Sequence, residues 1–269
     1  MVTHPSSAYL QSACDAGLLY EFAGHPYVAG SYEDPVSGDL QYLVEYCDAG
    51  LLDVPDGVSG LFQELTARFL DPGWMRIRVR SAVRLPRPWE PAVTYLRFSG
   101  TPAVTHPDDI QVTIARAGDE HDLLVEEWLS RALCSGYAMQ NRPVDATKVR
   151  ATSSALLALT GRCSYVALVE GAAVGHLTLL DDAVDEVTAE EYVDLFDMLV
   201  EPGTHAPAAR RGLVAAAASH AGSLSKALIG NVVHPQDASD VDQGQTVVDA
   251  LCERGWQIDH VDWRRHHAG

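Results

Sequence analysis

One alanine-rich stretch, PAARRGLVAAAASHA at residues 207–221, has residue types that suit phosphate binding. Arg210 and Arg211 supply positive charge, and Gly212 lets a ligand approach the backbone closely. Because helix N-termini direct backbone N–H groups at anions, we expect a phosphate site where a helix begins near Gly212. The alternative is a plain helix, since alanine is the best helix former and needs no ligand.

Acidic residues crowd the segment before this stretch. Residues 181–201 contain no Lys or Arg, and their carboxylates belong to Asp181, Asp182, Asp185, Glu186, Glu190, Glu191, Asp194, Asp197 and Glu201. Such a run attracts a cationic molecule, although many acidic runs are only solvated surface. His176 lies just upstream and is a candidate proton carrier, because the ordinary pKa of histidine lies near neutrality.

The bulk composition excludes several classes of protein. A formal charge of −18 over 269 residues argues against a nucleic-acid partner, whose phosphates require a basic surface. The chain lacks an apolar run long enough for a membrane span, and its N-terminus does not resemble a signal peptide. The five cysteines form no CxxC pair, and the histidines lack metal-ligand spacing. We therefore expect a cytoplasmic protein with reduced thiols, no metal and no membrane partner, either monomeric or homodimeric.

The length suits two domains. RFSGTPAVTHPDD at 97–109 resembles a linker, so we expect an N-terminal domain at 1–105 and a larger domain at 106–269. In the first, SGLFQELTARFL at 59–70 predicts a helix, and WMRIRVR at 74–80 predicts a half-buried strand. The arginines of that strand form either an anion-binding row or a solvated face.

The hexapeptide CDAGLL occurs at residues 14–19 and again at 47–52. Two copies are too few for a repeat array. We interpret each copy as a helix that ends at a glycine.

The second part alternates strands and helices. We expect strands at 110–117, 192–200, 226–233 and 257–265, a hairpin at 164–180 turning at Glu170 and Gly171, and helices at 118–133, 212–221 and 244–256. This order predicts one mixed sheet over residues 110–265 with helices on both faces.

Four stretches in this order resemble the GNAT superfamily of acyl-CoA-dependent N-acyltransferases. They are VTIARAGDEHDLLVEEWL, YVALVEGAAVGHLTL, LVEP followed by RRGLVAAAASHA, and VVDALCERGW. The resemblance covers about residues 110–265. It implies an α/β fold with a mixed, mostly antiparallel sheet flanked by helices, and a smaller N-terminal α/β domain that is a degenerate second copy or an accessory domain.

The resemblance also implies a site for acetyl-CoA or a related acyl-CoA. In the family a splayed central strand offers backbone N–H groups to the cofactor, and the turn before the next helix receives its pyrophosphate. The corresponding residues are Met198, Leu199, Val200, Arg210, Arg211, Gly212, Leu213, Val214, Ala215 and Asn231. Val214 stands where the family pattern has glycine or alanine.

Three residues are candidates for proton transfer. Strand alternation places Asp194, Phe196, Met198 and Val200 on one face, with Asp197 on the other. Asp194 also lies six residues before Val200, where some family members carry a catalytic glutamate, so it is the first candidate for the base. His176 is the alternative base. Leu251 occupies the position of the usual acidic tyrosine, so Tyr192 or a water is expected to serve as the acid.

The function expected from these residues is the transfer of an acyl group, in the first instance acetyl, to a small amine. Cationic amines are among the expected acceptors. Two alternatives stay open. One is a non-catalytic module that binds acyl-CoA or a partner protein. The other is an acyl-CoA decarboxylase or another altered reaction on the same fold.

Overall fold

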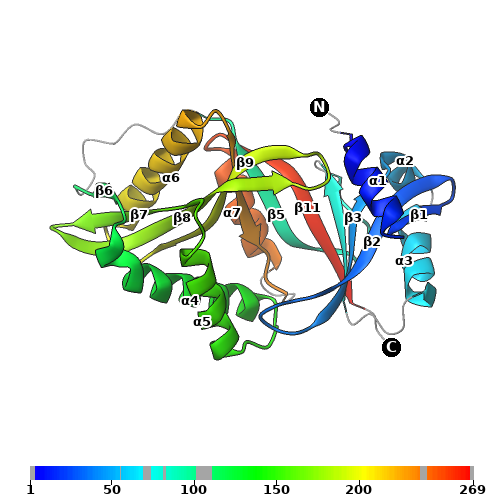
Figure 1. The fold of residues 1–269 in the computed structure, drawn as a ribbon, viewed down its shortest axis with the longest axis horizontal. Coiled ribbons are helices and arrows are strands. Elements are labelled where there is room, and N and C mark those ends of the chain that lie inside the picture. The colour runs from blue at the N-terminus through cyan, green and yellow to red at the C-terminus, as the bar shows by residue number, and fades with distance from the viewer. Residues whose placement is uncertain are drawn as a thin grey trace. The chain divides into compact units, whose positions relative to one another are not determined.

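The computed structural model describes residues 4–54, 56–68, 74–80, 83–100, 111–236 and 241–266. The chain divides into two compact units, each described here by itself (Figure 1). The first comprises 1–94, 185–190 and 259–269, and the second comprises 95–184 and 191–258. The boundary expected at residues 105–106 lies outside the described residues, so a domain division at that point stays a prediction.

The first unit has the strand order β1-β2-β3-β4-β11. β1, β2 and β3 pair antiparallel in sequence, β3 pairs parallel with β4, and β4 pairs antiparallel with the end of β11. Helices connect β3 to β4, because a parallel pair requires a crossover. The elements are α1 (Ser7–Asp15), β1 (Leu19–Phe22), β2 (His25–Glu33), β3 (Leu40–Cys47), α2 (Ala49–Asp53), α3 (Gly57–Arg68) and β4 (Trp74–Arg80).

Two sequence predictions are confirmed in the first unit. β4 alternates, with Met75, Ile77 and Val79 buried and its arginines partly exposed. Leu61, Phe62 and Leu65 are buried on α3. The predicted continuation of that helix to residues 69–70 lies outside the described residues.

The second unit has the strand order β5-β10-β9-β8-β7-β6. Helices α6 and α7 pack with one apolar cluster that includes Leu177, Leu179 and Trp256, while α4 and α5 pack with another around Trp128 and Val166. Since Val166 and Ala167 are strand neighbours that belong to different clusters, the helices cover both faces of the sheet (Figure 1). The elements are β5 (Glu90–Phe98), β6 (Thr113–Arg116), η1 (Asp119–His121), α4 (Asp122–Met139), α5 (Ala146–Leu157), β7 (Arg162–Val169), β8 (Ala172–Asp185), β9 (Glu190–Val200), α6 (Ala206–Ser223), β10 (Ala227–Val233), α7 (Val241–Cys252) and β11 (Trp256–His266).

The expected α/β class is confirmed, and so is the element order from residue 113 onward except that helix α5 was not predicted. The hairpin turns at Glu170 and Gly171, both with positive φ, as predicted. β6 to β10 form the mixed sheet predicted for this range, whereas the final strand, β11, has a partner that was not predicted. Most of β11 pairs with β4, from His260 opposite Arg80 to His266 opposite Trp74. That pairing joins segments about 180 residues apart, which local periodicity does not reveal.

The two units share a topological pattern. In the first, β3 leads through helices to the parallel strand β4, and in the second, β9 leads through α6 to the parallel strand β10. An antiparallel series precedes the crossover in both, β1-β2-β3 in one and β6-β7-β8 in the other. This pattern fits the expected degenerate second copy of the fold.

Gly212 has a packing role on α6. A Cβ added at Gly212 would lie 2.8 Å from Cγ1 of Ile114 on β6, so the glycine lets the helix approach that strand. At Gly222, near the end of the same helix, an added Cβ would have no described neighbour within 4 Å. The two glycines are therefore a matched pair for testing this close approach.

We expect Gly222→Ala to stabilise the protein by about 0.5–1 kcal/mol, because alanine is the better helix former. Gly212→Ala should forfeit that gain and be less stable than Gly222→Ala by at least about 1 kcal/mol, because overpacking forces a backbone or side-chain shift. Denaturant unfolding of both variants measures the difference. Equal stabilisation by the two alanines would show that a methyl group at residue 212 fits beside Ile114.

Candidate active site

The candidate site lies where β9 and β10 part. The strands pair from Tyr192 opposite Ala227 to Leu195 opposite Gly230, and then β9 continues to Val200 and β10 to Val233. Backbone groups beyond the last pair are left to other partners, because every buried N–H and C=O requires one. The predicted residues Met198, Leu199 and Val200 lie on this segment of β9, and Asn231 is the first residue of β10 beyond the last pair.

The predicted start of a helix near Gly212 is wrong. α6 begins at Ala206, with Pro207 in its first turn, so Arg210, Arg211 and Gly212 lie in its second turn. Pro207 starts the helix early because proline favours the first helical positions. The predicted residues Leu213, Val214 and Ala215 therefore lie farther still along the helix, and Leu213 is buried in the apolar core.

The true N-terminus of α6 retains the features that suit an anion. Its N-cap residue, His205, supplies no side-chain hydrogen bond to the first turn. The Ala206 N–H donates to the Gly203 carbonyl and the Ala209 N–H to that of His205. Ala208 lies between them, in the turn whose N–H groups a helix cannot satisfy internally.

The predicted alternation along β9 is wrong. Phe196 packs with the cluster around Trp128, as does Leu199, whereas Met198 and Val200 pack with the cluster under α6 and α7. Phe196 and Met198 thus face opposite sides although they are two residues apart. An irregularity between them shifts the side-chain alternation by one residue, as β-bulges do.

Asp194 occupies the last pair but one before the strands part, opposite Ile229. It is partly exposed but closely surrounded by protein, and this desolvation raises the pKa of its carboxyl from 3.8 to about 7. A carboxyl with a pKa near neutrality is suited to accept and release a proton at physiological pH.

His176 and Asp197 form a close pair. Nε2 of His176 lies 2.9 Å from Oδ2 of Asp197. The imidazole is fully buried and stacks on Trp128, with ring centroids 5.2 Å apart and planes 15° apart. The pair places Asp197 on the side of the sheet covered by α4, contrary to the alternation predicted for β9.

Glu201 holds Trp128, the residue on which His176 stacks. The Trp128 indole N–H donates to Glu201 Oε1 over 3.1 Å, and Nη1 of Arg131 lies 2.6 Å from the same oxygen. These hydrogen bonds lower the pKa of the Glu201 carboxyl. Sequence reasoning missed Trp128, Arg131 and the role of Asp197. The only signal was that Trp128 and Glu201 lie inside the stretches resembling the family.

Tyr192 lies two residues before Asp194 on β9, and its assignment as the acid stays a prediction. It pairs with Ala227 at the start of β9, at the end of the strand opposite to Val200. Leu251, at the position of the family's tyrosine, packs against the apolar cluster under α6. The thiol of the next residue, Cys252, is exposed. Tyr192 or a water therefore stays the expected acid.

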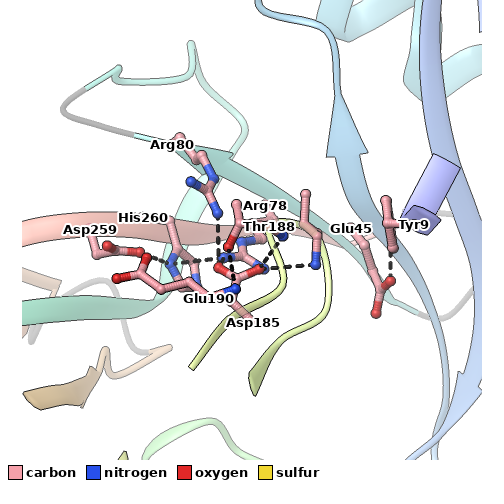
Figure 2. Close-up of polar contacts among 10 residues, drawn as sticks. Tyr9, Glu45, Arg78, Arg80, Asp185, Thr188, Glu190, Asp259 and His260 are labelled. Atoms are coloured by element: carbon pink, nitrogen blue, oxygen red, sulfur yellow. Dashed lines mark hydrogen bonds and ion pairs between the residues drawn. The ribbon is translucent and has the colours of Figure 1, made fainter. Parts of the chain in front are cut away.

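Most of the acidic run has internal partners and is strand rather than loop. Asp181 lies 2.8 Å from His220 Nε2, Glu191 lies 3.0 Å from Lys226 Nζ, and Glu201 pairs with Arg131. In the first unit, Asp185 binds Arg78 at 2.5 Å and Arg80 at 2.8 Å. Figure 2 shows both guanidinium groups directed at this carboxylate. The arginine row of β4 therefore holds an anion, and that anion is a side chain of the protein.

The described residues contain no cluster of His, Cys, Asp and Glu that would hold a metal ion. Within the same residues, no helix is both long and apolar enough to cross a membrane.

Comparison with known proteins gives distant structural likenesses. A protein from Pyrococcus furiosus assigned as an acetyl transferase is 16% identical over 55% of this chain and 93% of its own, with a TM-score of 0.42. A tandem GNAT protein from the clavulanic acid biosynthesis pathway is 14% identical over 93% of this chain and 82% of its own, with a TM-score of 0.42. An aminoglycoside N-acetyltransferase in complex with CoA is 15% identical over 55% and 90%, with a TM-score of 0.37.

No protein-family model and no curated protein match the chain. The TM-scores are low, so the description of the fold rests on the order and pairing of the chain's own elements.

The raised pKa of Asp194 predicts a pH-dependent cost in stability. The folded state binds this proton more tightly than the unfolded state, so stability should fall as pH rises from about 4 to about 7. Asp194→Asn removes the cost, and its stability advantage over wild type should grow by about 1–4 kcal/mol between pH 4 and pH 8.

Urea unfolding of both proteins at the two pH values measures this change. Asp182→Asn is the control, because Asp182 is an exposed carboxylate on the same hairpin. An advantage of Asp194→Asn that is the same at both pH values would mean that the carboxyl titrates normally.

Proposed function

We propose that this chain is an acyl-CoA-dependent N-acyltransferase that transfers an acyl group, acetyl in the first instance, to a small amine. The observation that carries the proposal is the parting of β9 from β10 immediately after a carboxylate whose pKa lies near 7. The element order that resembles the GNAT superfamily supports it. Acyl-CoA is then the co-substrate.

Asp194 is the proposed base. Its carboxylate takes a proton from the acceptor ammonium, and the neutral amine attacks the thioester carbonyl. The C–N bond forms as the C–S bond breaks, and the proton that leaves nitrogen is passed through water to the thiolate sulfur. Backbone N–H groups of β9 beyond Leu195 would stabilise the negative charge that develops on the carbonyl oxygen.

The N-terminus of α6 is the proposed pyrophosphate site. Ala206 and Ala208 are small and follow directly on the end of β9 through a turn, so a phosphate can approach the first-turn N–H groups. Arg210 is exposed one turn later and adds positive charge. The residues present therefore fit a nucleotide phosphate, at a position four to six residues before the one expected.

We expect Asp194→Asn to lower turnover by a factor of about 10² to 10⁴ while acyl-CoA affinity stays within about twofold, because the amide cannot accept the proton. The wild-type rate should rise with pH through an ionisation near 7, and the variant should lose that limb. Thiol release from acetyl-CoA against a panel of amines measures both effects. A variant with the wild-type rate and pH profile would transfer the role to His176 or to water.

The position of the phosphate site has its own test. Ala208→Glu places a carboxylate in the first turn of α6, which favours the helix by about 0.3–1 kcal/mol but repels a bound phosphate. We expect it to bind acetyl-CoA at least about tenfold more weakly than Ala208→Gln, as measured by isothermal titration. Equal affinities would argue that the pyrophosphate lies elsewhere.

The same titration separates the proposal from its main alternative. Leu251 in place of the usual tyrosine favours a non-catalytic module, which would bind acetyl-CoA but release no thiol with any amine. Absence of both binding and thiol release would overturn the acyltransferase and the module together.

A further inference from the structure

We propose that Asp197 binds a second positive charge on the acceptor, that His176 is the positioning residue for Asp197, and that the acceptor is therefore a diamine. The inference rests on the proposed acyl transfer at β9, and it deepens that function by naming the class of acceptor.

Asp197 is a nearly buried carboxylate with too few donors. Its side chain is 11% exposed, and its Oδ2 atom is buried without an aligned hydrogen-bond donor among the described residues. Within that part of the chain its ion-pair partner is the His176 imidazole, whose Nε2 lies 2.9 Å away but off the hydrogen-bonding direction. A buried carboxylate in this condition is costly unless a ligand supplies donors.

His176 is held so that it cannot turn toward a better partner. Its ring is fully buried and stacks on Trp128, whose N–H is fixed by Glu201. Nδ1 of His176 is also buried without a hydrogen bond in the part of the chain that the structure describes. The imidazole therefore packs against the Asp197 carboxylate without an aligned hydrogen bond to it, and an external ligand can supply the missing donors.

An ammonium group is the ligand that fits. It carries three N–H donors and no acceptor, so it satisfies a carboxylate without leaving an unpaired lone pair. The neighbouring acids Asp181, Glu191 and Glu201 are paired with basic groups of the protein. Asp194 is half protonated near neutral pH. Asp197 is therefore a carboxylate of this strand that can hold an external cation.

The cation at Asp197 must be a different group from the amine that is acylated. The acylated nitrogen loses its charge, whereas an ammonium bound to Asp197 keeps its charge throughout. Asp194 and Asp197 are three residues apart on one strand, at most about 10 Å, which is within the reach of a short alkyl chain. An acceptor with two amino groups joined by such a chain satisfies both carboxylates.

The test compares diamines with monoamines of equal length. The α,ω-diaminoalkanes of three to six carbons and the matching n-alkylamines are titrated into the wild-type protein without acyl-CoA, and then assayed as acceptors with acetyl-CoA. We expect wild type to bind its best diamine at least tenfold more tightly than the matching monoamine. Asp197→Asn, which is nearly isosteric, should abolish this preference, and Asp182→Asn should keep it.

Two variants of His176 separate positioning from simple stability. His176→Phe keeps the ring stacked on Trp128 but removes Nε2, and should lose most of the diamine preference. His176→Gln restores a nitrogen at a similar reach and should recover part of it. Unfolding midpoints of all variants show that they are folded. If both His176 variants keep the full preference, the positioning role is overturned.

The outcomes distinguish this inference from the proposed function. Equal binding and equal turnover of diamines and monoamines would overturn the diamine site while leaving acyl transfer intact. A diamine preference that requires Asp197, in a protein that releases no thiol, would establish the site and overturn the acyltransferase. A preference that survives Asp197→Asn would place the second charge elsewhere.

Discussion

The candidate site depends on how far β9 stays paired with β10. Four residue pairs hold the strands together, from Tyr192 to Leu195, and beyond them β9 continues through Val200 without a register partner on the described residues of β10. β8 flanks this segment on its other side, so its backbone groups on the β10 side are the ones proposed to meet the cofactor. The paired part holds Asp194 in a desolvated position, and the parted part carries Asp197. One change in strand pairing thus creates both chemical features of the site.

A formal charge of −18 overstates the negative charge that is left without a partner near β9. Most carboxylates of the run that enters β9 are neutralised by specific groups, including Arg78 and Arg80 around Asp185. The pairs of Asp185 are largely buried and those of Glu191 and Glu201 are more exposed, but each removes charge from the local field. The ligand proposed at β9 therefore meets chiefly Asp194 and Asp197 and less of the charge of the run as a whole. This selectivity is visible only in the folded chain.

Local sequence patterns predicted most elements but not their ends or long-range partners. Alternation identified β4, and the Glu170–Gly171 turn located the β7–β8 hairpin. The two CDAGLL copies show that the same local sequence can lie at either end of a helix. The first ends α1 as predicted, but in the second Asp48 caps the start of α2 by accepting the Gly50 N–H. Neither the change of side between Phe196 and Met198 in β9 nor the pairing of β11 with β4 leaves a local signal, because tertiary packing decides both.

The errors at α6 share one physical cause. The residues RRG match a phosphate-binding pattern, but the pattern specifies only small size and positive charge, and a packing contact requires small size as well. Gly212 is small because Ile114 of β6 lies against it, inside the helix and away from any free N–H group. An anion requires the first turn, where N–H groups have no acceptor, and that turn is located by Pro207 and by the end of β9. Phosphate recognition is therefore a property of where the helix begins, and a glycine contributes to it only when it lies at that beginning.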